Sequence, residues 1–131
     1  MDSIKPGLTG EAQMVVGTND TAPRVGSGRI AVLATPMMIN LIEEAALNAV
    51  EDLLPDGKQS LGTLLEVSHV APTPVGMKVT ATAELIEIDG RKLTFRVEAR
   101  DAVDLIGEGR HDRVVVTGSA FVDRVKAKAG D

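Results

Sequence analysis

One long helical segment, followed by segments of strict alternation, constrains the fold of this chain most. Thr35 is a good helix N-cap, and Pro36 suits the first helical position. Good helix formers then run from Met37 to Leu54, before a Pro-Asp-Gly stop. The apolar residues at helical spacing are Met38, Leu41, Ile42, Ala45, Ala49 and Leu53. At 1.5 Å per residue this helix is about 27 Å long, enough to cross a small sheet.

After the helix the apolar period changes from 3.6 to 2, which predicts strands. The predicted segments are Leu61 to Val70, Val79 to Leu85, Leu93 to Ala99, and about Glu108 to Val122. Asp89-Gly90 predicts a tight type I′ hairpin turn between the second and third of these. We therefore expect one helix packed on a five-stranded antiparallel sheet, an α+β fold with its last four strands in a meander.

The segment before the helix supplies the remaining strand and a loop. Glu11 to Gly17 predicts a short strand, and Asn19 to Gly28 predicts a loop long enough to act as a lid over a site. The length of 131 residues suits a single domain, 1–131, and residues 126–131 are expected to form a flexible tail.

Composition and charge exclude several classes of partner. The net charge of −5 repels a phosphate backbone, and aromatic platforms for bases are missing, so nucleic acid is not expected. The only aromatic residues, Phe95 and Phe121, are predicted to lie in the core. The absence of Cys fits a reducing compartment. Without a signal-like segment or an apolar run of 18 residues, we expect a cytoplasmic protein that does not enter membranes.

The inventory of catalytic groups is small. The only histidines are His69 and His111, and no HxxxH or HExxH spacing is present, so no metal site is expected. No dinucleotide-binding glycine pattern, P-loop or GxSxG elbow occurs either. His111 lies in the charged run Arg110 to Arg113, which is typical of a surface.

Three polar residues stand in apolar surroundings: Thr35, Glu43 and His69. Each has a functional and a structural interpretation, because buried polar groups mark sites only statistically. Thr35 could simply cap the helix, Glu43 could share its wet face with Glu44, and His69 could point from a strand into water.

These residues lie in stretches that resemble the fluoroacetyl-CoA thioesterase branch of the hotdog superfamily, over about three quarters of the chain. The matching stretches are Ala34-Thr35-Pro36-Met37-Met38 with Glu43, Ser60-Leu61-Gly62-Thr63, Val67 to Gly76, Val79 to Leu85, and Gly107 to Arg113. The resemblance implies a hotdog fold, with one central helix wrapped by a five-stranded antiparallel sheet. It also implies a homodimer, possibly assembled further, whose sheets pair edge to edge and whose active sites lie at the subunit interface.

The resemblance assigns roles to five positions. Thr35, Glu43 and His69 fall on the family's catalytic set, with Glu43 and His69 possibly supplied by different chains. Gly62 falls on the glycine that holds substrate through its backbone, and Arg113 on an arginine near the site or the dimer seam.

The implied activity is metal-independent hydrolysis of a short acyl-CoA, with no cofactor beyond the CoA of the substrate. Glu43 could activate water as a general base or attack the thioester directly to give an acyl anhydride, and the sequence leaves both routes open. One stretch departs from the family: Arg24 to Ile30 lacks the aromatic lid residues of fluoroacetyl-specific members, which argues against fluoroacetyl selectivity.

Two other functions remain open from the sequence. A non-catalytic hotdog module would bind acyl-CoA or a related ligand, although retention of all three polar residues tells against it. A hotdog dehydratase is disfavoured, because the Asp/His pairing typical of that class is not evident.

Overall fold

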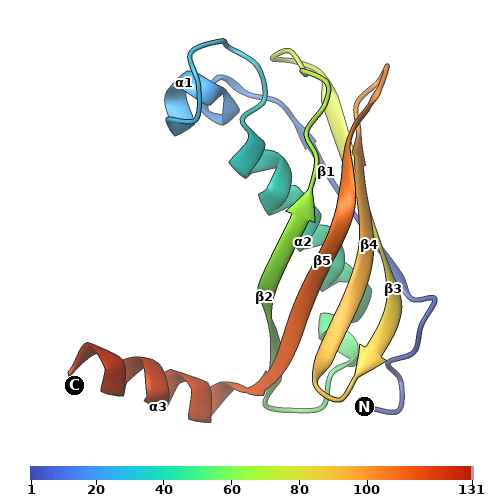
Figure 1. Cartoon of the computed structure of the whole chain (residues 1–131), viewed down its shortest axis with the longest axis vertical. Coiled ribbons are helices and arrows are strands. Elements are labelled where there is room, and N and C mark those ends of the chain that lie inside the picture. The colour runs from blue at the N-terminus through green and yellow to red at the C-terminus, as the bar shows by residue number, and fades with distance from the viewer. Residues whose placement is uncertain (131) are drawn as a thin grey trace.

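A computed structural model describes residues 1–130 as one sheet wrapped around one long helix, with a second helix projecting from it (Figure 1). The strands are β1 (Thr9–Val15), β2 (Lys58–Val67), β3 (Lys78–Asp89), β4 (Lys92–Arg100) and β5 (Leu105–Thr117). The helices are η1 (Thr18–Asp20), α1 (Ala22–Val25), α2 (Thr35–Val50), η2 (Glu51–Leu53) and α3 (Gly118–Ala129).

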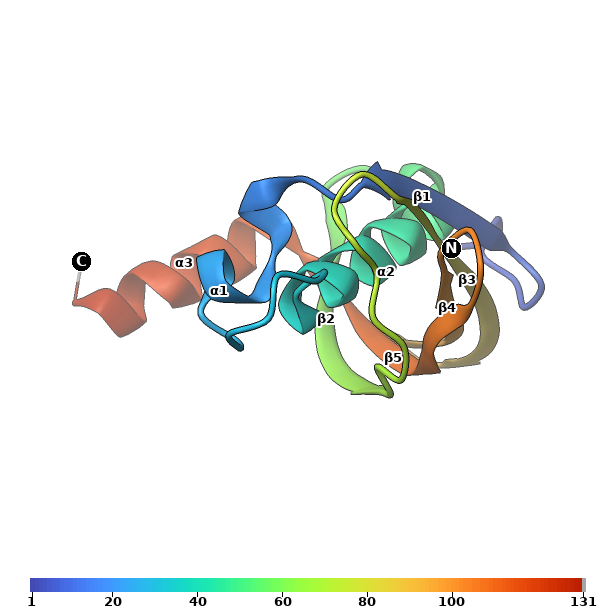
Figure 2. The same cartoon turned by 90° about the horizontal axis from the view of Figure 1, so that it is seen from above.

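The five strands form one antiparallel sheet in the order β1-β3-β4-β5-β2. Seen from above, the sheet curls around α2, so that strands lie on more than one side of the helix (Figure 2). The predicted α+β architecture, a long helix wrapped by five antiparallel strands, is therefore confirmed.

The predicted four-strand meander is wrong at its first step. Only β3, β4 and β5 form a meander, because β2 pairs with β5 at the far edge of the sheet. The chain crosses from β2 back to β3 through residues 68–77, which pass over the end of the sheet near the start of α2. The alternation predicts His69 inside a strand, but His69 lies on this crossover.

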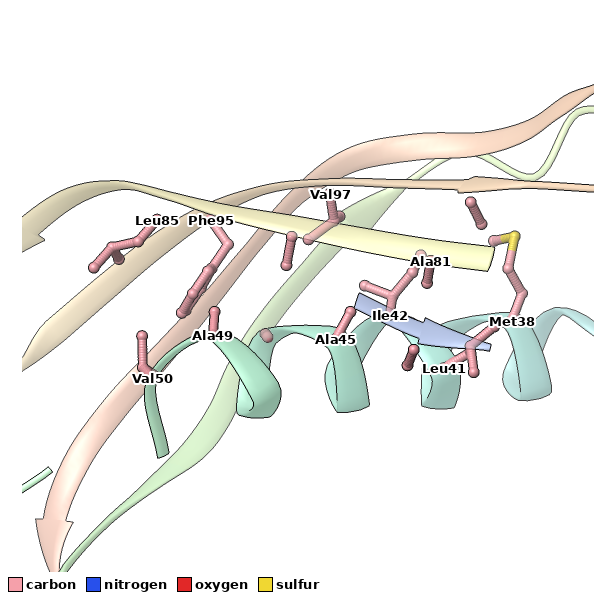
Figure 3. Close-up of a cluster of buried hydrophobic side chains, with 14 of the residues drawn as sticks. Met38, Leu41, Ile42, Ala45, Ala49, Val50, Ala81, Leu85, Phe95 and Val97 are labelled. Atoms are coloured by element: carbon pink, nitrogen blue, oxygen red, sulfur yellow. The ribbon is translucent and has the colours of Figure 1, made fainter. Parts of the chain in front are cut away.

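The core lies between α2 and the concave face of the sheet (Figure 3). The predicted stripe of α2 is buried except at its end, and its partners come from β3 and β4. In Figure 3 Met38, Ile42, Ala45 and Ala49 face Ala81, Leu85, Phe95 and Val97. Burial of this aliphatic surface, at about 25 cal/mol per Å², fixes the helix on the sheet.

Both ends of α2 differ from the prediction. Ala34 takes the N-cap position, and Thr35 is the first helical residue, so the Thr35 hydroxyl is free for another partner. At the other end the α-helix stops at Val50 and continues as the tighter turn η2. The change in helical period turns Leu53 outward, to 42% exposed, instead of extending the apolar stripe.

The hairpin between β3 and β4 has a two-residue loop, Gly90-Arg91, rather than Asp89-Gly90. A type I′ turn needs positive φ at both loop residues, and only Gly90 has it, with φ at 60°. One positive φ at the first loop position fits type II′. The predicted hairpin is therefore present, but its turn is of another type and begins one residue later.

The last strand ends earlier than predicted. β5 stops at Thr117, and the residues from Gly118 onward form α3, which includes positions 126–129 of the predicted tail. No residue of α3 is buried, and both views show the helix leaving the body of the molecule (Figures 1 and 2). Phe121 is therefore not a core residue, and the Arg124 guanidinium stacks over its ring at 5.4 Å.

Strand β1 approaches α2 backbone to backbone at Gly10. A Cβ atom at this position would overlap the carbonyl oxygen of Ala45 and the backbone of Ala49. The small residues Ala45 and Ala49 of α2 thus allow a close helix–strand contact.

We expect Gly10→Ala to lower the free energy of unfolding by about 1–3 kcal/mol or more, because backbone atoms cannot yield as a flexible side chain would. Thermal unfolding would show this as a lower Tm, while Gln13→Ala, at an exposed position of the same strand, serves as the matched control. An unchanged Tm for Gly10→Ala would contradict the close contact.

Candidate functional site

Thr35 and His69 form a hydrogen-bonded pair at the start of α2. The Thr35 Oγ1 and His69 Nδ1 atoms are 2.7 Å apart. The Nε2 atom of the same ring is buried and has no hydrogen-bond partner among residues 1–130. The structural interpretations of both residues fail here, because Thr35 does not cap the helix with its side chain and His69 does not point into water.

Backbone contacts fix the two segments that carry this pair. The Ser68 and Val70 amides donate to the carbonyls of Glu108 and Ile106 on β5, at 2.9 and 2.7 Å. The Leu33 amide donates to the Thr73 carbonyl at 2.9 Å, which ties the crossover to the entry of α2. His69 is therefore held between two sheet-like hydrogen bonds and opposite the first helical turn.

His69 is poised to accept a proton. Burial disfavours the imidazolium and lowers the pKa of His69 below its ordinary value, so the ring is neutral at pH 7. In the tautomer with its proton on Nδ1, the neutral ring donates to Oγ1 of Thr35, which leaves the Thr35 hydroxyl proton for another acceptor and the Nε2 lone pair for a proton. Such a pair can orient a hydroxyl or move a proton.

The pair opens into a hollow of about 310 Å³, at the small end of ligand sites. Besides the pair itself, its lining is mostly aliphatic: Ala22, Ser27, Val32, Leu33, Val70, Ala71 and Pro72. Ser27 belongs to the predicted lid, whose next residues include Ile30 at 74% exposed. The hollow suits a small apolar group.

Glu43 lies two turns further along α2 and points to strands β5 and β2, at one side of the sheet. Its Oε2 atom is 3.3 Å from Nη1 of Arg113 and 4.0 Å from Nε2 of His111. The carboxylate is about one third exposed, whereas Arg113 and His111 are buried. Arg113 thus donates a charge-assisted hydrogen bond to the Glu43 carboxylate.

His111 contributes as a neutral ring. Its Nδ1 atom donates to the Leu64 carbonyl at 2.8 Å, which leaves Nε2 to accept from Nη1 of Arg113 at 3.0 Å. Burial lowers the pKa of His111, and the neighbouring Arg113 cation acts in the same direction. The Glu43–His111 contact is thus not an ion pair at pH 7.

Gly62 leaves room for the Glu43 carboxylate. A Cβ atom on Gly62 would come within 2.5 Å of Oε2 of Glu43 and 3.1 Å of Cε1 of His111. The glycine precedes a bulge in the β2–β5 pairing, between residues 62 and 64. Its predicted role in holding substrate through the backbone stays a prediction, but the structure adds a reason for having no side chain there.

Within one chain the predicted catalytic residues form two separate groups. Thr35 and Glu43 are eight residues apart on one helix, a rise of about 12 Å. His69 accompanies the first residue, and Arg113 with Gly62 accompanies the second. The structure brings Glu43 to an imidazole, but to that of His111 instead of His69.

Sequence reasoning missed three residues that contact the second group. His111 lies beside Glu43 and Arg113, Ser60 accepts a hydrogen bond from Arg113, and Glu51 accepts one from Ser60. The placement of His111 at the surface was wrong, since its exposed fraction is 0%. Counting back by twos from the buried Val115 reaches Arg113 and His111, so strand alternation was the signal that could have found them. Nothing local in the sequence links Glu51 to Ser60.

Two features, a metal-binding cluster and a membrane-spanning helix, are absent from residues 1–130. No group of three His, Asp or Glu side chains is arranged to hold a metal ion. No helix is sufficiently long and apolar to span a bilayer. Independence from metals and cofactors remains a prediction.

Sequence comparisons match this chain to thioesterases. The family model FlK, described as fluoroacetyl-CoA-specific thioesterase, matches residues 16–119. The fluoroacetyl-CoA thioesterase of Streptantibioticus cattleyicolor is 45% identical over 97 residues, which cover 74% of this chain and 70% of that protein.

Solved structures agree in fold. A crystal structure of the fluoroacetyl-CoA thioesterase FlK superposes with a TM-score of 0.91 at 37% identity, covering 97% of this chain and 98% of that one. A thioesterase superfamily member from Thermus thermophilus superposes with a TM-score of 0.85 at 27% identity, covering 99% and 98%.

Proposed function

We propose, from the premise that this chain belongs to the fluoroacetyl-CoA-specific thioesterase family, that it hydrolyses short acyl-CoA thioesters to the free acid and CoA in the cytoplasm. The observation that carries the proposal is the hydrogen bond of 2.7 Å between Thr35 and His69. Both residues line a small, mainly apolar hollow. A hydroxyl paired with a neutral imidazole in such a place matches the needs of a reacting carbonyl.

The proposed chemistry divides between the two groups of residues. Glu43 removes a proton from water, whose oxygen attacks the thioester carbonyl, or Glu43 itself attacks that carbon. Thr35 donates to the developing oxyanion beside the start of α2, where the helix dipole also favours negative charge. Collapse of the tetrahedral species breaks the C–S bond and releases CoA thiolate. In the second route, water then hydrolyses the acyl anhydride, which frees the acid and restores the Glu43 carboxylate. In both routes His69 passes a proton that comes from water to the thiolate.

We propose that a homodimer brings the two groups together. Among the described residues β2 has β5 as its one neighbour, so its other edge is free, and Leu64 and Leu65 on it are 36% and 39% exposed. Free edges of this kind pair readily with a second chain. In an antiparallel pair in which residue 65 faces residue 66 of the partner, residue 69 would face residue 62 of the partner. Because Gly62 lies beside Glu43 of its own chain, His69 of one subunit would then approach Glu43 of the other.

The acyl group is expected to be short and not specifically fluorinated. Residues 24–30 carry no aromatic side chain, and the hollow is lined mainly by small aliphatic residues. We therefore expect acetyl-, propionyl- and butyryl-CoA all to be hydrolysed, and kcat/KM for acetyl- and propionyl-CoA to lie within about 10²-fold of the value for fluoroacetyl-CoA, since one methylene in an apolar pocket is worth about 10- to 200-fold.

A thiol-release assay with these four thioesters tests the function, and binding of each measured by calorimetry serves as its companion. Turnover of at least one acyl-CoA is the expected result. Binding without hydrolysis of any of them would instead identify a non-catalytic acyl-CoA-binding module. A large preference for fluoroacetyl-CoA would overturn the specificity argument alone.

A further inference from the structure

The Arg113 guanidinium is held on every side by protein groups. Nε donates to Oγ of Ser60 at 2.8 Å, and Nη2 donates to the Ser60 carbonyl at 3.0 Å. Nη1 faces both Nε2 of His111, at 3.0 Å, and Oε2 of Glu43, at 3.3 Å. Two of these four contacts go to Ser60, so Ser60 sets the plane of the guanidinium.

Ser60 is itself held by Glu51, which follows the last turn of α2. The Ser60 amide donates to Oε2 of Glu51 at 3.0 Å, and the Ser60 hydroxyl donates to Oε1 at 2.6 Å. Since a hydroxyl has one proton and two lone pairs, it can donate to Glu51 while accepting from Arg113. A continuous chain of hydrogen bonds therefore runs from Glu51 through Ser60 and Arg113 to Glu43.

Glu43 has little else to orient it. Among residues 1–130 its carboxylate has Arg113 as its one hydrogen-bond donor, and its side chain is 35% exposed. A glutamate side chain with such freedom would adopt several rotamers in water. Its direction toward the sheet depends on a fixed guanidinium.

We propose that Ser60 and Glu51 are positioning residues of the thioesterase reaction, acting through Arg113 on the Glu43 carboxylate. The inference rests on the proposed function of Glu43. Neither residue touches the hollow or the Thr35–His69 pair; their effect is to hold the buried Arg113 cation where it directs the Glu43 carboxylate at the sheet.

The decisive variants are Ser60→Ala, which removes the hydroxyl, and Ser60→Thr, which restores it. For Ser60→Ala we expect kcat to fall about tenfold with KM within about twofold, because the guanidinium that directs Glu43 loses its anchor. Ser60→Thr should recover most of kcat. Glu51→Gln should resemble Ser60→Ala more weakly, while Asp52→Asn, its exposed neighbour, should match the unsubstituted protein.

A spectroscopic measurement separates this inference from the proposed function. The Nε–H proton of Arg113 should give an arginine NMR signal that exchanges slowly with water and is lost in Ser60→Ala. A slow signal in a protein without thioesterase activity would refute the function but leave the hydrogen-bond chain standing. An unchanged kcat in a folded Ser60→Ala variant would overturn the positioning role.

Discussion

A Glu43→Gln variant is expected to lose at least about 10²-fold in kcat while keeping its fold, as is usual when a general base or nucleophile is removed. Glutamine has nearly the same shape and keeps an oxygen that can accept from Arg113 at the position of Oε2. It cannot take a proton from water or form an acyl anhydride. The loss should therefore appear in kcat measured by thiol release, with KM much less affected.

The adjacent residue provides the matched control for this experiment. Glu44 is exposed on the next position of α2 and makes no contact with Arg113, so Glu44→Gln changes the same charge without changing the site. Its turnover should equal that of the unsubstituted enzyme. Near-normal kcat in Glu43→Gln, with both variants showing the same Tm, would remove Glu43 from the mechanism.

Mixing two inactive variants should restore activity if the site is shared between subunits. Random assembly of equal amounts of Glu43→Gln and His69→Ala chains makes half of the dimers mixed. Each mixed dimer then has one site with both residues intact, if Glu43 of one chain serves His69 of the other. We expect about one quarter of the unsubstituted activity after joint refolding or coexpression.

The hydrogen bond between Thr35 and His69 supplies the control for mixing, since these two residues meet within one chain. A mixture of Thr35→Ala and His69→Ala chains should stay inactive, because each site then lacks one member of the pair. Failure of the Glu43 and His69 variants to complement each other would place the whole site within one subunit, contrary to the 12 Å rise, about eight residues of helix, that separates its parts.

Regular periodicity allowed most of the fold to be predicted. The apolar stripe of α2 and the alternation of β3 and β4 identify these elements because each residue there faces either core or solvent. The position of β2 beside β5 could not be predicted, since strand order depends on a crossover that leaves no local pattern. α3 was missed for a related reason: Phe121 and Val122 in its first turns resemble the apolar residues of β5, and the N-cap Thr117 itself ends the β-branched run of that strand.

The candidate site was predictable where side chains stand alone in apolar sequence, as with Thr35, Glu43 and His69. It was not predictable where a charged run folds inward. Arg110 to Arg113 looks like a surface, but alternation sends His111 and Arg113 to the core while Arg110 stays exposed. Their burial is tolerable only because Ser60, Leu64 and Glu43 satisfy them, and these partners come from distant parts of the chain.

Gly10 fixes how far α2 can turn about its own axis. Successive residues of a helix are about 100° apart, so Ala45 and Ala49 lie roughly on the side of the cylinder opposite Glu43. A larger side chain on β1 would roll the helix as well as lift it, and a roll of one residue would carry the carboxylate off the sheet. The direction of the Glu43 carboxylate therefore depends on the absence of a side chain at Gly10, on the opposite side of the helix.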